Sequence, residues 1–384
     1  MHITEPERRL PVAAEADVAV IGGGTAGLPA ALAAARAGAE VLLIERSGYF
    51  GGQASGGLTI TIPEDRQGVI TNELEERLTA AGGAVKQTVK GENWLVWDPE
   101  LFKWMSVLML EEAKVRMLLY TLCAGVIMEG DAARGVIIEN RGGRQAVRAK
   151  VVIDCTGDAD VIALAGAGYK KGDENGAMLP PTMMAMIAGI DESKFPNNSL
   201  GLPNYHTAVT GLFPGYVNLW AGRVPGADCT DPWDVTRAEN VMRKCAVEAV
   251  FNARKNIPGC ENAFLTMTAT QHGTRETRKL DAEYWITEDD WSSGRIFDDH
   301  VGFAYIGKSI PYRSMLPKKT DNLLAAGRCV ACVPEIMRLI PSCMVNGYAA
   351  GRAAALAADA GIAPRGVDII ELQKSLRADG VPMG

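Results

Sequence analysis

The chain has 384 residues, enough for two or three domain-sized units at roughly 150 residues each. Its 39 Lys and Arg against 46 Asp and Glu give a formal net charge of −7, which argues against a strongly basic nucleic-acid binder. Hydrophobic and charged residues make up 47% and 22% of the chain, which excludes disordered and fibrous proteins.

No apolar run reaches the ~18 residues that a membrane span needs. The polar start of the chain lacks the apolar segment of a signal peptide. Eight cysteines are too few for a disulfide scaffold in a chain of this length. We therefore expect a cytoplasmic protein with mostly reduced thiols.

The first elements in chain order form one strand–helix–strand unit. We expect residues 1–15 to be an N-terminal arm. The apolar run 18–21 predicts a buried parallel strand, the Ala-rich segment 25–37 predicts a helix, and 41–44 predicts a second buried strand.

Two further helices are expected at 71–81 and 99–113, the second with Asp98 as its N-cap. Three β-rich runs between residues 118 and 153 predict an antiparallel meander, followed by a return strand at 151–153. The pattern of the first unit resumes at 322 with a strand, a loop and a helix over about 342–360.

The stretch 176–300 differs from the rest of the chain. It holds four of the seven Trp residues and scattered Pro, with no clear strand–helix–strand pattern. We therefore expect a discontinuous domain made of residues 16–175 and 301–384, with an inserted α+β substrate or cap domain at 176–300.

A glycine motif, Gly22-Gly23-Gly24-Thr25-Ala26-Gly27, joins the first strand to the first helix. The first motif glycine permits a tight turn, the second lets a pyrophosphate approach the backbone, and the third lets the helix pack against the sheet. The N-terminus of the helix offers free N–H groups to phosphates. Glu45 ends the next strand, where a carboxylate accepts hydrogen bonds from ribose hydroxyls. The strand, helix and acid together favour a dinucleotide site over a ligand-free glycine turn.

Three further stretches accompany this motif: a second glycine loop at 48–52, the segment 152–158, and the segment 322–328 with the helix after Pro341. With them the chain resembles the FAD-dependent oxidoreductases of the glutathione reductase superfamily. More narrowly, it resembles the FAD-dependent oxidoreductase family related to the flavin subunit of heterodisulfide reductase. The resemblance runs over about residues 12–360 and implies an α/β, Rossmann-like FAD-binding domain of the glutathione reductase type.

The resemblance also implies a set of FAD contacts that follow the cofactor from end to end. These are Gly22, Gly24, Thr25, Ala26 and Gly27 at the pyrophosphate, Glu45 and Arg46 at the adenosine ribose and adenine, Gly51, Gly52 and Gln53 after the pyrophosphate, Ser55, Gly56 and Gly57 at the flavin ring, Thr156, Gly157 and Asp158 at the adenosine half, Gly327 and Arg328 at the ribityl chain, and Ser342, Cys343 and Met344 at the flavin N1–C2=O edge. Arg328 departs from the Gly-Asp that the wider superfamily often has there.

The mode of cofactor binding and the route of the electrons follow from two absences in the sequence. The loop 47–54 has no His for covalent attachment, so we expect non-covalent FAD. No second glycine motif of the same kind occurs, so a resident NAD(P)H domain is not expected. Electrons would then come from a small organic substrate and leave to oxygen, a quinone or a protein.

The segment 271–278 holds the first catalytic candidates, with one His, one Glu and two Arg in eight residues. His272 would act as a base, removing a proton as a hydride leaves for flavin N5. Arg275 and Arg278 would clamp a carboxylate. The plainer interpretation is a structural turn whose arginines pair with Glu276 or contact FAD.

Candidates in other segments are weaker. Tyr312 is a second acid–base candidate, and Arg313 and Arg338 lie in segments that we expect to return to the flavin, where they would suit an anionic substrate. Each arginine alone is more often a surface or structural cation. His206 and His300 have no recognisable partner in the sequence.

Cys329 and Cys332 form a C-x-x-C pair, whose spacing allows a redox disulfide or half of a metal site. A zinc site would need two more ligands, and no second pair of this kind exists, so we expect no metal. The residues that follow, 333–335, are not expected to start a helix, which is the usual device for lowering a thiol pKa. Buried thiols are therefore the plainer interpretation.

The sequence thus predicts an FAD-dependent oxidoreductase that takes a hydride from a small organic substrate, for which an anionic group would be suitable. Two alternatives stay open: a thiol–disulfide flavoenzyme that uses Cys329 and Cys332, and a flavin-binding subunit of a larger complex. Neither a nucleic-acid partner nor a membrane span is expected. A homo-oligomer is compatible with the sequence.

Overall fold

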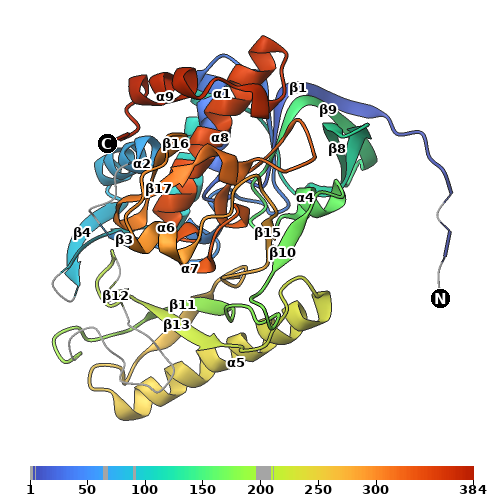
Figure 1. Ribbon diagram of the computed structural model, residues 1–384. Helices are drawn as coiled ribbons and strands as arrows, with labels where there is room; N and C mark the ends of the chain where they lie inside the picture. Colours follow the sequence, from blue (N-terminus) through green and yellow to red (C-terminus); the bar gives the residue numbers. More distant parts are fainter. Residues whose placement is uncertain (1–2, 5, 64–67, 90–91, 196–208, 211) are drawn as a thin grey trace.

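A computed structural model describes the chain except for residues 1–2, 5, 64–67, 90–91, 196–208 and 211. Figure 1 shows a large body, which contains both the first and the last part of the chain, above a smaller layer formed by a second sheet and the long helix α5. The chain start extends away from the body as an arm.

The main sheet has seven strands in the order β6-β2-β1-β9-β8-β7, and β18 pairs with β9. Its parallel part consists of β6, β2, β1, β18 and the second half of β9, and β7, β8 and the first half of β9 form an antiparallel meander. The strands are β1 (Val12–Ile21), β2 (Val41–Ile44), β6 (Arg116–Leu118), β7 (Leu122–Glu129), β8 (Ala132–Asn140), β9 (Gly143–Asp154) and β18 (Leu323–Ala325).

The central strands are buried on both faces, which explains their continuous apolar sequences. Residues 18–21 of β1 and all of β2 are buried. Helices α1 (Gly27–Arg36) and α8 (Ile340–Ala360) pack against each other and against β1. The sheet and this helix pair hold the main hydrophobic core.

Helices α1 and α8 come so close that two positions of α8 have no room for a side chain. A Cβ at Gly347 would lie 2.2 Å from the carbonyl oxygen of Ala26, and a Cβ at Gly351 would lie 2.1 Å from that of Ala30. The small residues of α8 therefore serve close helix packing.

A three-stranded sheet, β3-β5-β4, covers one side of the body together with two helices. The α3 helix begins where expected, because the Asp98 carboxylate accepts hydrogen bonds from the backbone N–H groups of Glu100 and Leu101. The elements are β3 (Thr61–Pro63), α2 (Val69–Ala80), β4 (Ala84–Val89), β5 (Glu92–Trp97) and α3 (Pro99–Glu112).

The second sheet has four antiparallel strands in the order β12-β13-β11-β14, and α5 packs on it. It has hydrophobic clusters of its own, separate from the main core. Its elements are β11 (Thr182–Ala188), β12 (Val209–Thr210), β13 (Val217–Arg223), α5 (Pro232–Asn256) and β14 (Phe264–Thr268).

The chain then returns to the body, where β15 pairs with β10. Leu280, Ile286 and Val301 belong to the main core, so we propose that the inserted unit ends near residue 269 and not near 300. The remaining elements are α4 (Asp160–Leu164), β10 (Tyr169–Lys171), β15 (Arg278–Leu280), α6 (Glu288–Ser292), β16 (His300–Ala304), β17 (Lys308–Pro311), α7 (Pro334–Met337) and α9 (Ile369–Ala378).

Three boundaries differ from expectation. Residues 12–15, which we placed in the arm, belong to β1 because they pair with β9. The third run of the meander and the return strand are one strand, β9, which changes partner along its length. Helix α8 begins at Ile340, before Pro341, since proline fits the first turn of a helix. Among the residues described, no helix is long and apolar enough to cross a membrane.

The contact between α1 and α8 leads to a prediction about stability. Gly351→Ala should lower the free energy of unfolding by about 2 kcal/mol, because the new Cβ meets backbone that cannot move aside cheaply. Denaturant unfolding followed by Trp fluorescence measures this. Gly366→Ala is the control, since its Cβ would find its nearest neighbour at 3.7 Å, and a loss as large as that of Gly351→Ala would contradict the explanation.

Candidate functional site

A cleft of about 400 Å³ opens at the carboxyl ends of the parallel strands. This is the edge where open α/β sheets bind their ligands. Gly24 and Glu45 line it after β1 and β2, and Asp158 lines it after β9. Glu239 of α5 lines it from the inserted unit, and His272 lines it from the segment that returns to the body.

The three motif glycines have different physical roles. Gly22 has φ +98°, and a Cβ there would lie 2.5 Å from the Cys155 carbonyl oxygen. A Cβ at Gly27 would lie 1.7 Å from the Gly22 carbonyl oxygen. Both glycines are therefore required by packing. A Cβ at Gly24 would meet only the Cα of Gly52, at 3.8 Å, which is an ordinary contact.

Gly24 is thus the motif glycine that the protein's own packing does not require. It lines the cleft, and a side chain there would fill space that is open above the backbone. A pyrophosphate needs this space in order to approach the N-terminus of α1. The observation supports the fit of a dinucleotide cofactor to this loop.

Glu45 supports the glycine loop directly. Its two carboxylate oxygens accept hydrogen bonds from the backbone N–H groups of Gly23 and Ser47, each at 2.7 Å. A carboxylate has about four acceptor positions, so lone pairs remain for ribose hydroxyls. Arg46 lines the same end of the cleft.

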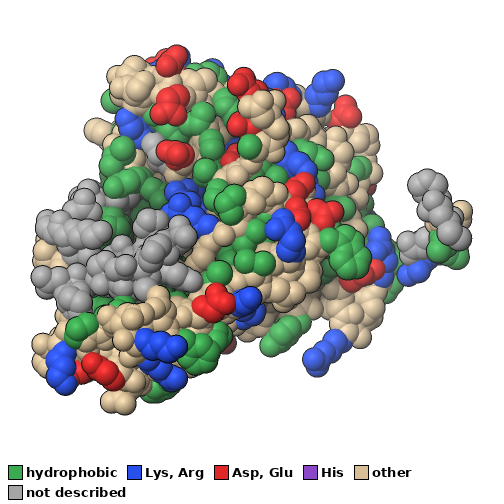
Figure 2. All heavy atoms as spheres, turned by 90° about the horizontal axis from the view of Figure 1, so that it is seen from below, with side chains coloured by type: hydrophobic (Ala, Val, Ile, Leu, Met, Phe, Trp, Pro, Cys, Tyr) green, Lys and Arg blue, Asp and Glu red, His purple; other side chains and the backbone are tan. Residues whose placement is uncertain are grey.

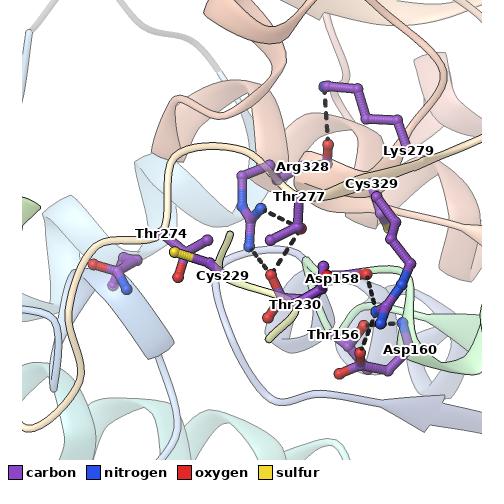
Figure 3. Close-up of polar contacts among 12 residues, drawn as sticks. Thr156, Asp158, Asp160, Cys229, Thr230, Thr274, Thr277, Lys279, Arg328 and Cys329 are labelled. Carbon is purple, nitrogen blue, oxygen red and sulfur yellow. Dashed lines mark hydrogen bonds and ion pairs between the residues drawn. The ribbon is translucent and has the colours of Figure 1, made fainter. Parts of the chain in front are cut away.

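Asp158 and Arg328 form a buried ion pair beside the cleft, with 2.5 Å between the guanidinium nitrogen and the carboxylate oxygen. Thr277 donates to the same oxygen at 2.9 Å and accepts from Arg328 at 2.8 Å (Figure 3). Burial alone would raise the pKa of Asp158, but the charge and hydrogen bond of Arg328 outweigh it and lower that pKa. The guanidinium of Arg328 thus binds Asp158 and Thr277 of the protein itself, a contact that the sequence did not predict.

The neighbouring Asp154 fixes the loop that carries Thr156. Its carboxylate accepts hydrogen bonds from the N–H and hydroxyl of Thr156 and from the N–H of Ile162. Burial raises the pKa of Asp154 to about 6 despite these bonds. Gly327 lies opposite, where its N–H donates to Asn346 at 2.6 Å.

Most of the expected FAD contacts line the cleft, but several do not. Ser55 donates to the Phe50 carbonyl oxygen, the Ser342 hydroxyl accepts from the Tyr305 N–H, and Met344 accepts from Thr71, so these side chains bind the protein. The expected contacts that the structure does not bring to the cleft surface are Gly27, Gly51, Ser55, Gly56, Gly57, Ser342 and Met344. From the start of α8, the expected Cys343 does line the cleft, together with Ile340, which was not expected.

His272 lies in a polar cluster that the sequence did not reveal. Its Nδ1 lies 2.8 Å from the Glu239 carboxylate, which also accepts from the His272 backbone N–H at 3.0 Å. Its Nε2 lies 2.9 Å from the Thr274 hydroxyl and 3.7 Å from the Cys229 sulfur. Figure 3 shows Cys229 and Thr274 next to each other.

The charge of His272 follows from this cluster. Burial alone would lower its pKa, but the hydrogen bonds with Cys229 and Glu239, and their charges, raise it to about 9. His272 is therefore mainly protonated at neutral pH. As a base it would act only in the small deprotonated fraction, which corrects the simple picture of a neutral imidazole.

The structure brings Arg338 to the cleft and moves two other candidates away from it. Tyr312 is buried and donates to the Pro364 carbonyl oxygen at 2.9 Å, and burial raises its pKa far above the usual range. Arg313 is half-exposed and pairs with Asp299 at 2.9 Å. Neither lines the cleft, so their assignment to catalysis is withdrawn.

The remaining basic candidates are Arg278, His300 and His206. Arg278 pairs with Asp160 at 3.0 Å beside the adenosine end, so it is not part of a clamp with Arg275. His300 is buried beside Phe303, away from the cleft surface. His206 lies outside the described residues.

Cys329 and Cys332 are both fully buried and have different partners. Cys329 donates to backbone carbonyl groups, and Cys332 accepts from Lys279 at 3.4 Å. Burial raises the pKa of both thiols, although α7 does begin at Pro334, contrary to expectation. Neither lines the cleft, so the geometry does not favour a redox pair.

Sequence reasoning missed Glu239, Cys229 and Thr277. Glu239 and Cys229 are 33 and 43 residues away from His272, and on α5 a glutamate looks like any solvent-facing charge. The available signal was that 271–278 is dense in polar side chains that need partners once buried.

The cradle at Gly24 leads to a prediction about cofactor binding. Gly24→Ala should raise the Kd for FAD at least about tenfold, because the methyl group occupies the space that the pyrophosphate needs. Fluorescence titration of apoprotein with FAD measures the Kd. The unfolding free energy of the apoprotein should stay within about 0.5 kcal/mol of the original. Unchanged FAD affinity would show that the cofactor does not approach this backbone.

Two curated relatives match part of the chain. Digeranylgeranylglycerophospholipid reductase 2 of Methanopyrus kandleri is 32% identical over 151 residues, which cover 37% of this chain and 38% of that protein. Thiamine thiazole synthase of Methanococcus vannielii is 33% identical over 165 residues, which cover 39% of this chain and 59% of that protein. Both matches span less than two thirds of the relatives' own length.

Solved structures of flavoproteins share the fold. A geranylgeranyl bacteriochlorophyll reductase-like protein of Thermoplasma acidophilum aligns over 95% of this chain and 82% of its own, with a TM-score of 0.54 and 16% identity. The p-nitrophenol 4-monooxygenase of Pseudomonas putida aligns over 95% and 88%, with a TM-score of 0.55 and 13% identity. These likenesses show an α/β FAD-binding Rossmann-like fold.

The family follows from the sequence match together with the cleft. The FAD dependent oxidoreductase family matches residues 17–307 and 304–376, which is most of the chain. The glycine loop, Glu45 and the open space above Gly24 fit its cofactor. The chain therefore belongs to the FAD dependent oxidoreductase family, and FAD is its cofactor.

Proposed function

We propose that the protein transfers a hydride from a C–H bond of a small organic substrate to FAD, with His272 as the residue that takes the accompanying proton. The bound flavin would supply the hydride acceptor at N5. The observation that carries the proposal is the pair formed by His272 of the returning segment and Glu239 of the inserted unit, which lines the cleft together with the glycine loop.

The residues around His272 would hold its ring and set its charge. Glu239 accepts from both the ring and the backbone of His272, which fixes the orientation of the imidazole. Gln53 donates to the His272 carbonyl oxygen at 3.0 Å and ties the segment to the loop that follows the glycine motif. Nε2 is then the atom through which a proton would move.

A second candidate is the reverse reaction, the reduction of a substrate by flavin that an external reductant has reduced. The observation that favours it is the pKa of His272 of about 9, because a protonated imidazole donates a proton at neutral pH. The reductases among the similar proteins are compatible with this direction.

Several finer assignments stay predictions. They are the glutathione reductase type, the relation to the flavin subunit of heterodisulfide reductase, non-covalent attachment, the absence of a resident NAD(P)H domain, and oxygen, a quinone or a protein as electron acceptor. The thiol–disulfide alternative is the least supported, because Cys329 and Cys332 are buried away from the cleft.

The direct experiment mixes the FAD-loaded protein anaerobically with a panel of hydroxy acids, amines and polyols. Bleaching of the flavin band near ~450 nm by a member of the panel would support hydride removal. A flavin that no panel member reduces, but that a chemical reductant reduces and an unsaturated substrate reoxidises, would favour the reverse reaction. Acid precipitation of the protein beforehand shows whether the flavin is released, as non-covalent binding requires.

The pH profile of flavin reduction provides a prediction about His272. If His272 is the base, the rate should rise about tenfold per pH unit and level off near pH 9, because only the deprotonated ring accepts a proton. In the reverse reaction the rate should instead fall above pH 9. Stopped-flow absorbance over pH 6–10 measures either profile.

Variants show whether His272 takes the proton in the reaction or has only a structural role. His272→Asn should flatten the profile, and Glu239→Gln should move its midpoint to lower pH, because the carboxylate helps to raise the pKa of His272. Glu248→Gln is the control, since Glu248 is on the same helix and pairs with Lys244 in solvent. If the midpoint of the pH profile is the same in Glu239→Gln as in the original protein, His272 is not the titrating group.

A further inference from the structure

Arg338 lies at the end of the cleft where α8 begins, and two further arginines, Arg275 and Arg223, are near enough for their charges to act on it. Arg338 lines the cleft just before this helix, and its Nε is buried without a hydrogen-bond partner in the described part of the chain. Arg275 lies three residues after His272 and is partly buried. Arg223 ends β13 and is exposed.

These side chains are close enough for their charges to interact. Burial lowers the pKa of Arg338, and with the added effect of the charges of Arg275 and Arg223 it falls to about 10. Burial also lowers the pKa of Arg275, again helped by the charge of Arg223. The opposing charge at this place is Glu335, which is exposed.

Other partly buried arginines of this protein have an acidic partner at contact distance. Arg328 pairs with Asp158 at 2.5 Å and Arg278 with Asp160 at 3.0 Å. Within the described ranges, neither Arg275 nor Arg338 makes an ion pair. Holding like charges together in a partly desolvated cleft costs free energy unless an anion joins them.

FAD itself does not supply that anion in its oxidised form. The ring system of oxidised flavin carries no net charge, and the pyrophosphate charge belongs at the Gly22–Gly27 motif and the N-terminus of α1. His272, protonated at neutral pH, adds a further positive charge to the cleft. The missing anion therefore has to come with another ligand.

We propose that Arg275 and Arg338 form a subsite for a carboxylate group of the substrate, with Arg223 at its rim. The planar guanidinium group binds a carboxylate through two parallel N–H donors. Arg338 lines the cleft, and its buried Nε has no partner in the described part of the chain that a ligand would have to displace. The inference rests on the proposed function insofar as the ligand is the substrate of the same cleft. It names the substrate class as small organic carboxylates.

The test measures binding and needs no turnover. The FAD-loaded protein is titrated with acetate, succinate and inorganic phosphate at constant ionic strength, with chloride as the reference anion. Calorimetry and the perturbation of the flavin absorbance report binding. We expect a carboxylate to bind, and Arg338→Met and Arg275→Gln each to weaken it at least about tenfold.

Arg313→Gln is the matched control, because this arginine is ion-paired with Asp299 outside the cleft and should leave binding unchanged. FAD content and the thermal midpoint of each variant establish that it folds. If Arg338→Met loses FAD, Arg275→Gln decides the question alone.

Three results would overturn the proposal. Carboxylate binding could be insensitive to both Arg338 and Arg275, or phosphate could bind with the expected dependence while no carboxylate does. Carboxylates could also bind only to apoprotein and compete with FAD, which would assign the arginines to the cofactor. His272→Asn tells this inference apart from the proposed function, because it should abolish the pH profile yet retain carboxylate binding.

Discussion

The ion pair between Arg328 and Asp158 joins three segments that are far apart in the sequence. Asp158 follows β9, Arg328 follows β18, and Thr277, which bonds to both, belongs to the segment that returns from the inserted unit. Lys279 adds a hydrogen bond to the Arg328 carbonyl oxygen at 3.2 Å. Because a buried carboxylate without its partner costs several kcal/mol, this contact fixes where the returning segment leaves the body.

The position of His272 depends on that anchor. The segment from residue 271 to 278 is held at one end by Thr277 and Arg278, and near the other by Gln53 and Glu239. The returning segment thereby presents a titrating group to the cleft that the glycine loop also lines. Neither unit contains the site alone, since the body supplies the cofactor cradle, the returning segment supplies His272, and the inserted unit supplies its partner Glu239.

The sequence could predict what depends on local geometry. The glycine spacing, the buried strand before it and Glu45 after the next strand identify a dinucleotide loop, because each role is set by neighbouring backbone. The Asp98 cap and the apolar strands at 18–21 and 41–44 are predictable for the same reason.

The sequence could not predict which distant side chains meet. Tyr312 and Arg313 lie in a segment that does return to the body, but a one-residue change of direction in a short 3-10 turn sends one side chain into the core and the other to Asp299. Glu239 approaches His272 because α5 packs on the second sheet, whose strand β14 leads into the segment that carries His272. Contacts of this kind depend on the tertiary structure and cannot be predicted from the composition of the sequence.

The buried thiols around the cleft also indicate which group carries the redox chemistry. Cys155, Cys329 and Cys343 lie close to the cofactor loop, and burial raises the pKa of each thiol. The thiolate is the reactive form, so these cysteines behave as small apolar side chains and compete poorly with flavin for electrons. Cys229 differs because it contacts His272, where it helps to keep the imidazole protonated. Among these thiols, Cys229 is therefore the one that acts on the pKa of His272, whereas the C-x-x-C pair is buried away from the cleft surface.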